Sequence, residues 1–144
     1  MESLERLKPL ALLLLRAALG VIFIYHGYPK LFVNARGTMT MFGHMGFPSY
    51  FAVIAGVLET FGGALLIVGL FTRIAALLLA GEMLIALWRV HGMFTHPMAV
   101  HNYELPMALS ASAFTIACVG AGAISLDRAI FGSRGGSSSR KAKN

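Results

Sequence analysis

The sequence predicts an all-α integral membrane protein: a four-transmembrane-helix bundle with a short amphipathic helix between the first and second spans. Hydrophobic residues make up 57% of the 144 residues and charged residues only 12%, whereas soluble domains carry about 25% charged residues. A surface with so few charges suits lipid better than water. Because one membrane span needs about 20 mostly apolar residues, four spans would use most of the chain.

The expected spans cover residues 10–32, 50–71, 73–90 and 103–126. A signal peptide is the rival interpretation of the first span. However, Arg16 lies inside its apolar stretch, and the stretch is too long for a signal peptide. The connection between the second and third spans is so short that these helices are expected to be antiparallel neighbours.

Residues 34–48 contain three glycines, one proline and scattered apolar side chains. This segment is too short and too polar to cross a membrane. It predicts a short amphipathic helix that lies at the membrane surface or caps the bundle. We expect residues 1–131 to form one membrane domain, and residues 132–144, rich in Gly, Ser, Lys and Arg, to form a disordered basic tail.

The formal net charge is +6, and much of the positive charge lies near the C-terminus. A basic tail after a last span is typical of the cytoplasmic side or of contact with anionic lipid, so no nucleic-acid partner is expected. If both termini are cytoplasmic, most of the cationic residues lie inside: Arg6, Lys8, Arg73, Arg128, Arg134, Arg140, Lys141 and Lys143. Lys30, Arg36 and Arg89 then lie outside. This bias predicts a multi-pass plasma-membrane protein with both termini in the cytoplasm.

Arg16, Glu59 and Glu82 fall inside the expected spans, where each charge costs about 2.5–3.5 kcal/mol on insertion scales. They should therefore face the bundle interior. Glycines share the helical faces of Arg16 and Glu59, so these faces are expected to pack closely. Arg16 can neutralise only one glutamate, and the other should be protonated or hydrogen-bonded elsewhere. Two interpretations stay open: a polar network that joins the helices, or a pocket for a proton or a small redox molecule.

Four polar residues are expected toward the outer half of the bundle: His26, Lys30, Tyr103 and Glu104. A quinone site needs hydrogen-bond donors for two carbonyls, a proton source and an apolar groove. Together with Glu59, these residues have the right chemistry for it. The alternative for His26 and Tyr103 is anchoring at the membrane interface.

The remaining histidines do not predict a metal centre. His91, His96 and His101 are spaced by five residues, which does not place them on one helical face, and Pro97 would interrupt a helix between them. We expect solvated loop histidines and no metal site. Cys118 is the single cysteine of the chain, which excludes an intrachain disulfide and dithiol chemistry.

Seven short motifs follow one another along the chain: Arg16…Gly20, GYPKL at 27–31, GFP at 46–48, ExxGG at 59–63, GLFTR at 69–73, NYE at 102–104 and GAGAISLD at 120–127. In this order and spacing, over residues 7–131, they resemble the DoxX family. The resemblance implies a small four-helix protein of the bacterial inner membrane. The resemblance also implies that the charged positions of the family correspond to five residues of this chain: Arg16, Lys30, Glu59, Glu104 and Asp127. Glu82 looks specific to this chain, and Tyr103 stands where the family usually has an aliphatic residue.

Family members often carry an oxidoreductase label, by analogy with a subunit of a thiosulfate:quinone oxidoreductase. The resemblance therefore implies a membrane subunit or accessory of a quinone-linked redox system. Its expected partners are the lipid bilayer, a redox partner protein and further copies of the chain, and Arg73 and Asp127 are expected to pair on the inner side. The alternatives are a small proton-coupled transporter that uses Glu59 and Glu82, or a non-catalytic membrane scaffold. Whether the chain is itself an enzyme stays open.

Overall fold

The computed structural model describes residues 2–90, 98 and 100–132, and this part of the chain contains helices and no strand. The elements in chain order are α1 (Glu2–Glu5), α2 (Lys8–Tyr28), the π-helix η1 (Pro29–Val33), α3 (Ala35–His44), α4 (Phe51–Val68), α5 (Thr72–Arg89), α6 (Val100–Val119) and α7 (Leu126–Phe131). The expected all-helical fold class is confirmed. The expected tail at 132–144 lies, apart from Gly132, outside the described residues.

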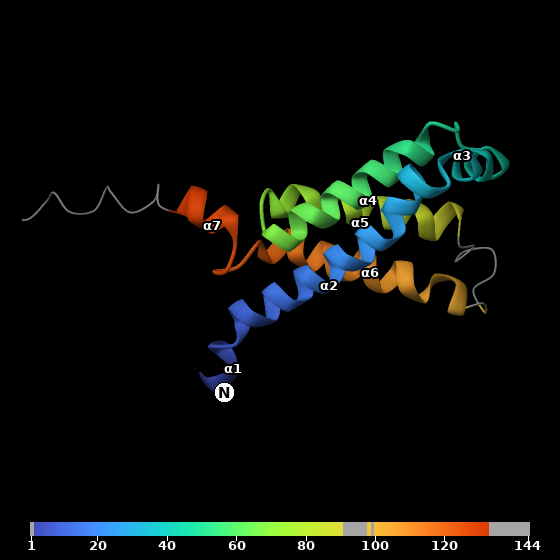
Figure 1. Cartoon of the computed structure of the whole chain (residues 1–144). Helices are drawn as coiled ribbons and strands as arrows, with labels where there is room; N and C mark the ends of the chain where they lie inside the picture. Colours follow the sequence, from blue (N-terminus) through green and yellow to red (C-terminus); the bar gives the residue numbers. More distant parts are fainter. Residues whose placement is uncertain (1, 91–97, 99, 133–144) are drawn as a thin grey trace, which may run out of the picture.

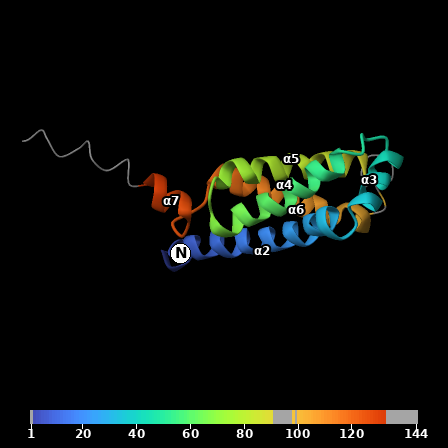
Figure 2. The same cartoon turned by 45° about the horizontal axis from the view of Figure 1, so that its top comes forward.

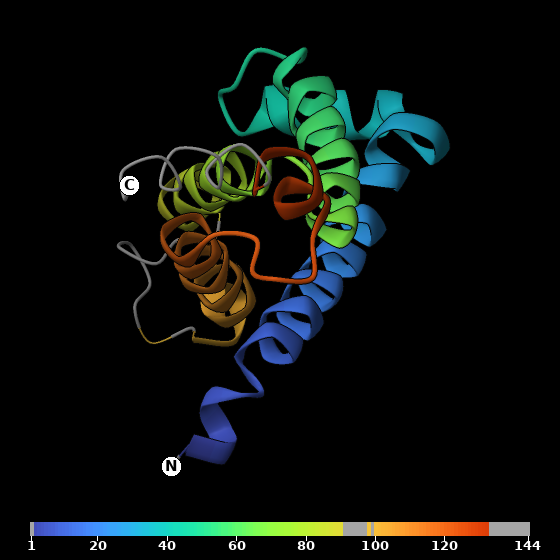
Figure 3. The same cartoon turned by 90° about the vertical axis from the view of Figure 1, so that its left-hand side faces the viewer.

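Four long helices, α2, α4, α5 and α6, run lengthwise beside one another (Figures 1 and 2). The most extensive contacts join α2 to α4 and α5 to α6, and α4 also packs on α5. Figure 3 looks along the helices and shows these two pairs side by side. We call the end with α1 and α7 the inner end, and the end with α3 the outer end (Figure 1).

Apolar side chains cover the outside of the helices as well as the core. Leu66, Leu79 and Ile116 are completely buried, but Phe61 is 59% and Ile74 is 62% exposed. Many other large apolar side chains on the long helices are exposed to a similar degree. An extended apolar surface of this kind is unfavourable in water and is normal against lipid.

Two segments within the described part of the chain are long and apolar enough to cross a membrane. They are Lys8–Val33, with a mean hydropathy of 1.9, and Phe51–Val68, with 2.1. The other two long helices are more polar. The helix α5 carries Arg73, Glu82 and Arg89, and α6 begins with His101, Asn102 and Glu104 among its first residues. A crossing by all four helices therefore remains a prediction.

The first long helix changes its hydrogen-bond pattern near the outer end. Pro29 has no backbone N–H, so the chain cannot continue the regular ladder at that point. From Pro29 to Val33 it forms a π-helix, and the N–H of Asn34 donates to the carbonyl of Pro29 at 2.9 Å. The Asn34 side chain then accepts a hydrogen bond from the Gly37 N–H at 3.2 Å and caps α3. A helix in the 34–48 segment is thus confirmed.

The last long helix differs from its prediction. It covers Val100–Val119 and not residues 103–126. Gly120 and Gly122 have φ angles of 94° and 79°, a left-handed conformation that glycine adopts without strain and that ends a helix. Residues 120–125 form an irregular turn before the short helix α7. The prediction was wrong at this end because residues 120–125 are small or apolar, so their composition does not distinguish them from a continuing helix.

Candidate functional site

The polar residues expected inside the bundle divide between its two ends. Near the outer half, Lys30 reaches from η1 to the middle of α4, and its Nζ lies 2.6 Å from Oε2 of Glu59. The Lys30 side chain is 23% exposed and the Glu59 side chain only 3%. This is an ion pair largely removed from solvent, where a charge without a partner would be costly. We call Lys30, Glu59 and Glu82 the polar site.

Small residues make the approach of α2 and α4 possible. A Cβ atom on Gly27 would lie 2.7 Å from Cβ of Glu59, and one on Gly20 would lie 2.5 Å from the carbonyl oxygen of Gly63. Real Cβ atoms essentially never come so close to a neighbour. The expectation that the glycine-bearing faces are the closely packed ones is confirmed. This contact also fixes the register that brings Glu59 beside the end of α2.

Glu82 on α5 completes the polar site. Its Oε2 atom is buried and has no hydrogen-bond partner within the described part of the chain. It lies close enough to Glu59 and Lys30 for their charges to interact with it. A buried carboxyl oxygen without a partner is costly to keep, and it leaves one polar atom free to bind a proton or a ligand.

Arg16 does not pair with a glutamate, contrary to the expectation from the sequence. Its guanidinium is completely buried and donates to the carbonyl of Ala121, and to that of Ile124 at 2.6 Å. A Cβ on Gly69 would lie 2.5 Å from its Nη1 atom. The register of α2 on α4 explains the difference, because Glu59 lies beside Gly27, 11 residues along α2 from Arg16, or roughly 16 Å away. Arg16 instead joins α2 to the turn at residues 120–125.

Arg73 and Asp127 also have partners other than the expected ones. The Asp127 carboxylate accepts the backbone N–H groups of Phe71 and Thr72, at 2.7 and 2.9 Å, and so caps the start of α5. Arg73 makes a long contact of 3.5 Å with the carbonyl of Val119. Four unpaired N–H groups begin every helix, and a carboxylate that binds two of them is held there strongly. This competition explains why no ion pair with Arg73 is recorded in the described region.

The expected outer cluster is only partly assembled. Lys30 binds Glu59, and His26 is close enough for its charge to interact with Glu59. The His26 ring is exposed, with Nδ1 2.8 Å from the carbonyl of Ile22. Tyr103 is buried on α6, whereas Glu104 beside it is exposed. Glu104 therefore does not belong to the buried polar site.

His91 and His96 lie outside the described residues, and His101 is exposed on α6. Within residues 2–90, 98 and 100–132, no group of three or more His, Cys, Asp or Glu side chains is placed to hold a metal ion.

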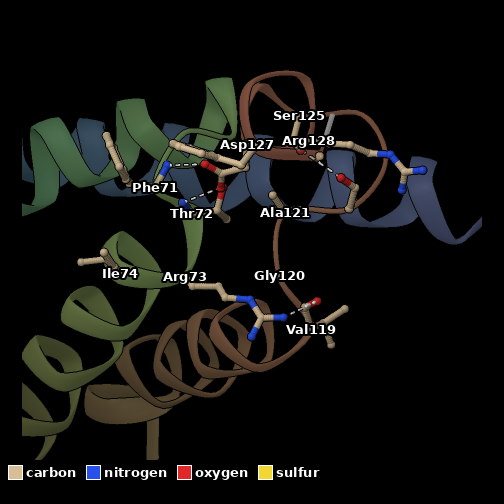
Figure 4. A pocket seen from close by; sticks show the side chains of 13 residues that line it. Phe71, Thr72, Arg73, Ile74, Val119, Gly120, Ala121, Ser125, Asp127 and Arg128 are labelled. Carbon is tan, nitrogen blue, oxygen red and sulfur yellow. Dashed lines mark hydrogen bonds between the residues drawn. The ribbon is translucent and has the colours of Figure 1, made fainter. Parts of the chain in front are cut away.

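An open cavity of about 690 Å³ lies at the inner end (Figure 4). Three segments line it: the start of α5, the end of α6 with the following turn, and α7. We call it the inner-end cavity. The sequence does not predict this cavity, because it forms where residues 120–125 leave the helix, and the pair Gly120 and Gly122 is the signal for that turn.

Comparison with known proteins identifies a family and several relatives by sequence. The model of the family described as DoxX matches residues 11–92. The chain is 34% identical over 119 residues to a protein of Bacillus subtilis named "Putative oxidoreductase CatD", covering 83% of this chain and 86% of that protein. It is 36% identical to an uncharacterized protein of Haemophilus influenzae, covering 91% and 98% of the two chains.

A further relative is the Escherichia coli inner membrane protein YphA, which is 33% identical over 84% of this chain and 91% of its own. No solved structure matches the chain. The motifs at 27–31 and 59–63 meet at the polar site, and those at 69–73 and 120–127 meet at the inner end. The chain is a membrane protein of the DoxX family.

Proposed function

We propose that this protein is a membrane subunit or accessory of a quinone-linked redox system, and that the polar site binds the quinone headgroup. The buried Lys30–Glu59 pair with an unpartnered Glu82 oxygen beside it carries the proposal. Intramembrane ionisable residues are expensive to keep and usually mark function. The name of the Bacillus subtilis relative supports redox chemistry.

The side chains fit a quinone headgroup. The Lys30 ammonium has three N–H donors, of which Glu59 needs one, so another can donate to a quinone carbonyl. The free Oε2 of Glu82 can accept or deliver a proton near the second carbonyl. A bound quinone would supply two-electron, two-proton redox chemistry. The chain's own part is to orient the headgroup, stabilise negative charge near Lys30 and exchange a proton at Glu82.

The proposed setting is the bacterial inner membrane, with four crossings and both termini cytoplasmic. The inner-membrane relative, the apolar outer surface and the excess of cationic residues at the inner end support it. The positions of α1 and α7 at one end of the bundle (Figure 1) agree with an even number of crossings. A C-terminal fluorescent-protein fusion should fluoresce, and a C-terminal alkaline-phosphatase fusion should be inactive. Active phosphatase would contradict this orientation.

The test of the redox proposal is quinone retention. The full chain is purified with its native lipids, and the quinone bound per protein is measured by mass spectrometry. We expect wild type and Glu104→Gln to retain quinone above the level in bulk lipid, and Glu82→Gln to retain less. Glu104→Gln is a matched control, because it removes an exposed glutamate. Quinone at the bulk-lipid level in wild type would overturn the proposal.

The same sample separates the alternatives. A transporter moves substrate or protons across liposomes without electron flow, whereas a scaffold co-purifies with a soluble redox enzyme. A redox subunit or accessory changes quinone reduction by its partner. Proton flux that depends on Glu82, in a sample without enriched quinone, would favour the transporter.

A further inference from the structure

We propose that the inner-end cavity binds the headgroup of an anionic membrane phospholipid, with Arg73 as its main cationic contact. The cavity opens where α5 begins and α6 ends. It therefore lies at the inner ends of two long helices, where lipid headgroups would be in the proposed orientation. The cavity shares no lining residue with the polar site.

The Arg73 guanidinium is available for an anion. It lies over Gly120, where a Cβ atom would be 3.1 Å from Nε and 3.2 Å from Nη2. Its recorded hydrogen bond to the Val119 carbonyl is 3.5 Å long, which is at the weak limit. A guanidinium has five N–H donors, and no salt bridge recorded for the described residues involves Arg73. The absence of a side chain at Gly120 thus leaves room for the Arg73 guanidinium, and most of its N–H donors are unused in the described part of the chain.

Asp127 is the cavity's anionic group, but its carboxylate is already bound by the first N–H groups of α5. Figure 4 shows Asp127 directed toward Phe71 and Thr72, while the Arg73 guanidinium lies across the opening beside Val119. Because the Asp127 carboxylate occupies these N–H groups, an anion cannot bind them. An anion in the cavity would therefore bind Arg73. Arg128 on α7 adds a second exposed cation at the rim.

The rim of the cavity favours a lipid over a free anion. Ile74 is 62% and Val119 55% exposed, on the two helices that begin and end at the cavity. Phe71 and Phe131 lie beside it with ring centroids 6.1 Å apart, and aromatic residues gather at the headgroup level of membranes. A phospholipid can place its phosphate on Arg73 and its acyl chains along these apolar side chains. Inorganic phosphate would gain only the first contact.

The test uses the full chain in nanodiscs that contain equal amounts of phosphatidylglycerol and phosphatidylcholine. After release into detergent, native mass spectrometry counts the retained lipids of each kind. We expect wild type to retain phosphatidylglycerol preferentially, and Arg73→Gln to lower that preference about fivefold, which corresponds to the roughly 1 kcal/mol of one cationic residue near an anionic surface. Arg73→Lys should keep a substantial part of it.

Arg6→Gln is the matched control, because it removes one exposed inner-end charge that does not line the cavity. The basic tail is present in every sample, so its contribution cancels. Unchanged lipid preference in Arg73→Gln, or an equal loss in Arg6→Gln, would overturn the proposal. Equal thermal stabilisation by millimolar inorganic phosphate and by phosphatidylglycerol would overturn the choice of a lipid. Quinone content, measured in the same samples, should be unaffected by Arg73→Gln.

Discussion

The ammonium of Lys30 lies 2.6 Å from the carboxylate of Glu59, at the point where the π-helix η1 meets the middle of α4. The pair connects two residues that lie 29 positions apart in the sequence. It depends on close backbone contact, since a Cβ atom on Gly27 would lie 2.7 Å from the backbone nitrogen of Thr60. The π-helix that begins at Pro29 and this glycine contact together place the lysine inside the bundle.

Glu59→Gln should lower the free energy of unfolding by about 3 kcal/mol, because it leaves the Lys30 charge without its buried partner. Chemical unfolding in detergent micelles measures the change. The double variant Lys30→Met/Glu59→Gln removes both charges and should be markedly more stable than the sum of its single variants implies. Simple additivity of the two single effects would show that the pair contributes no coupling.

Gly20→Ala should destabilise the bundle by about 1–3 kcal/mol, because the added methyl would meet the Gly63 carbonyl and force α2 away from α4. Gly81→Ala is the control. It lies within α5, where a Cβ would meet nothing within 4 Å, and alanine favours a helix over glycine by about 1 kcal/mol. Thermal unfolding in one detergent should therefore move in opposite directions for the two variants. A gain in stability for Gly20→Ala would contradict the close contact.

Arg16→Lys should loosen the turn at residues 120–125, because an ammonium lacks the planar fork that binds two carbonyls. The Gly120 N–H donates to Ile116 and the Asp127 N–H donates to Gly69, at 2.7 and 2.8 Å. Both amides should exchange hydrogen about tenfold faster, the equivalent of one lost charge-assisted bond. Arg6→Lys, which changes an exposed arginine, should leave both rates as they are.

Asp127→Asn should cost about 1 kcal/mol, because the amide replaces one of the two charged acceptor oxygens with an NH2 group that cannot accept the N–H of Phe71 or Thr72. Glu5→Gln provides the comparison. Glu5 forms an exposed pair with Lys8, and such pairs contribute little. Calorimetry on both variants would measure the difference, and equal melting temperatures would argue against the cap.

The helices could be predicted from composition because their signals are local. The third expected span, residues 73–90, differs by one residue at each end from α5, since Gly69 and Arg89 mark its limits clearly. The prediction of the fourth span, residues 103–126, was wrong at its C-terminal end, because α6 ends at Val119. Residues 120–125 are apolar or small throughout, and only the backbone conformation of two glycines separates them from a continuing helix.

The partners of the charges could not be predicted, because they depend on the register between helices. Arg16, Glu59 and Glu82 were correctly expected to face inward, yet Arg16 lies too far along α2 to meet Glu59. The Gly20–Gly63 contact fixes that register, and it follows from three-dimensional packing. The partners of Asp127 could not be predicted either, because they lie at the start of α5, 55 residues earlier in the chain.

Photolabelling with an azido-quinone tests directly whether the polar site takes a quinone headgroup. The full chain in native lipid is irradiated, and the labelled peptides are identified by mass spectrometry. We predict label in the peptides that contain Lys30, Glu59 or Glu82, reduced about tenfold in Lys30→Met/Glu59→Gln by loss of a charge-assisted hydrogen bond, and unchanged in Arg36→Gln. Label spread evenly along the apolar outer surface, or equal labelling of the polar site in the double variant, would contradict quinone binding at the polar site.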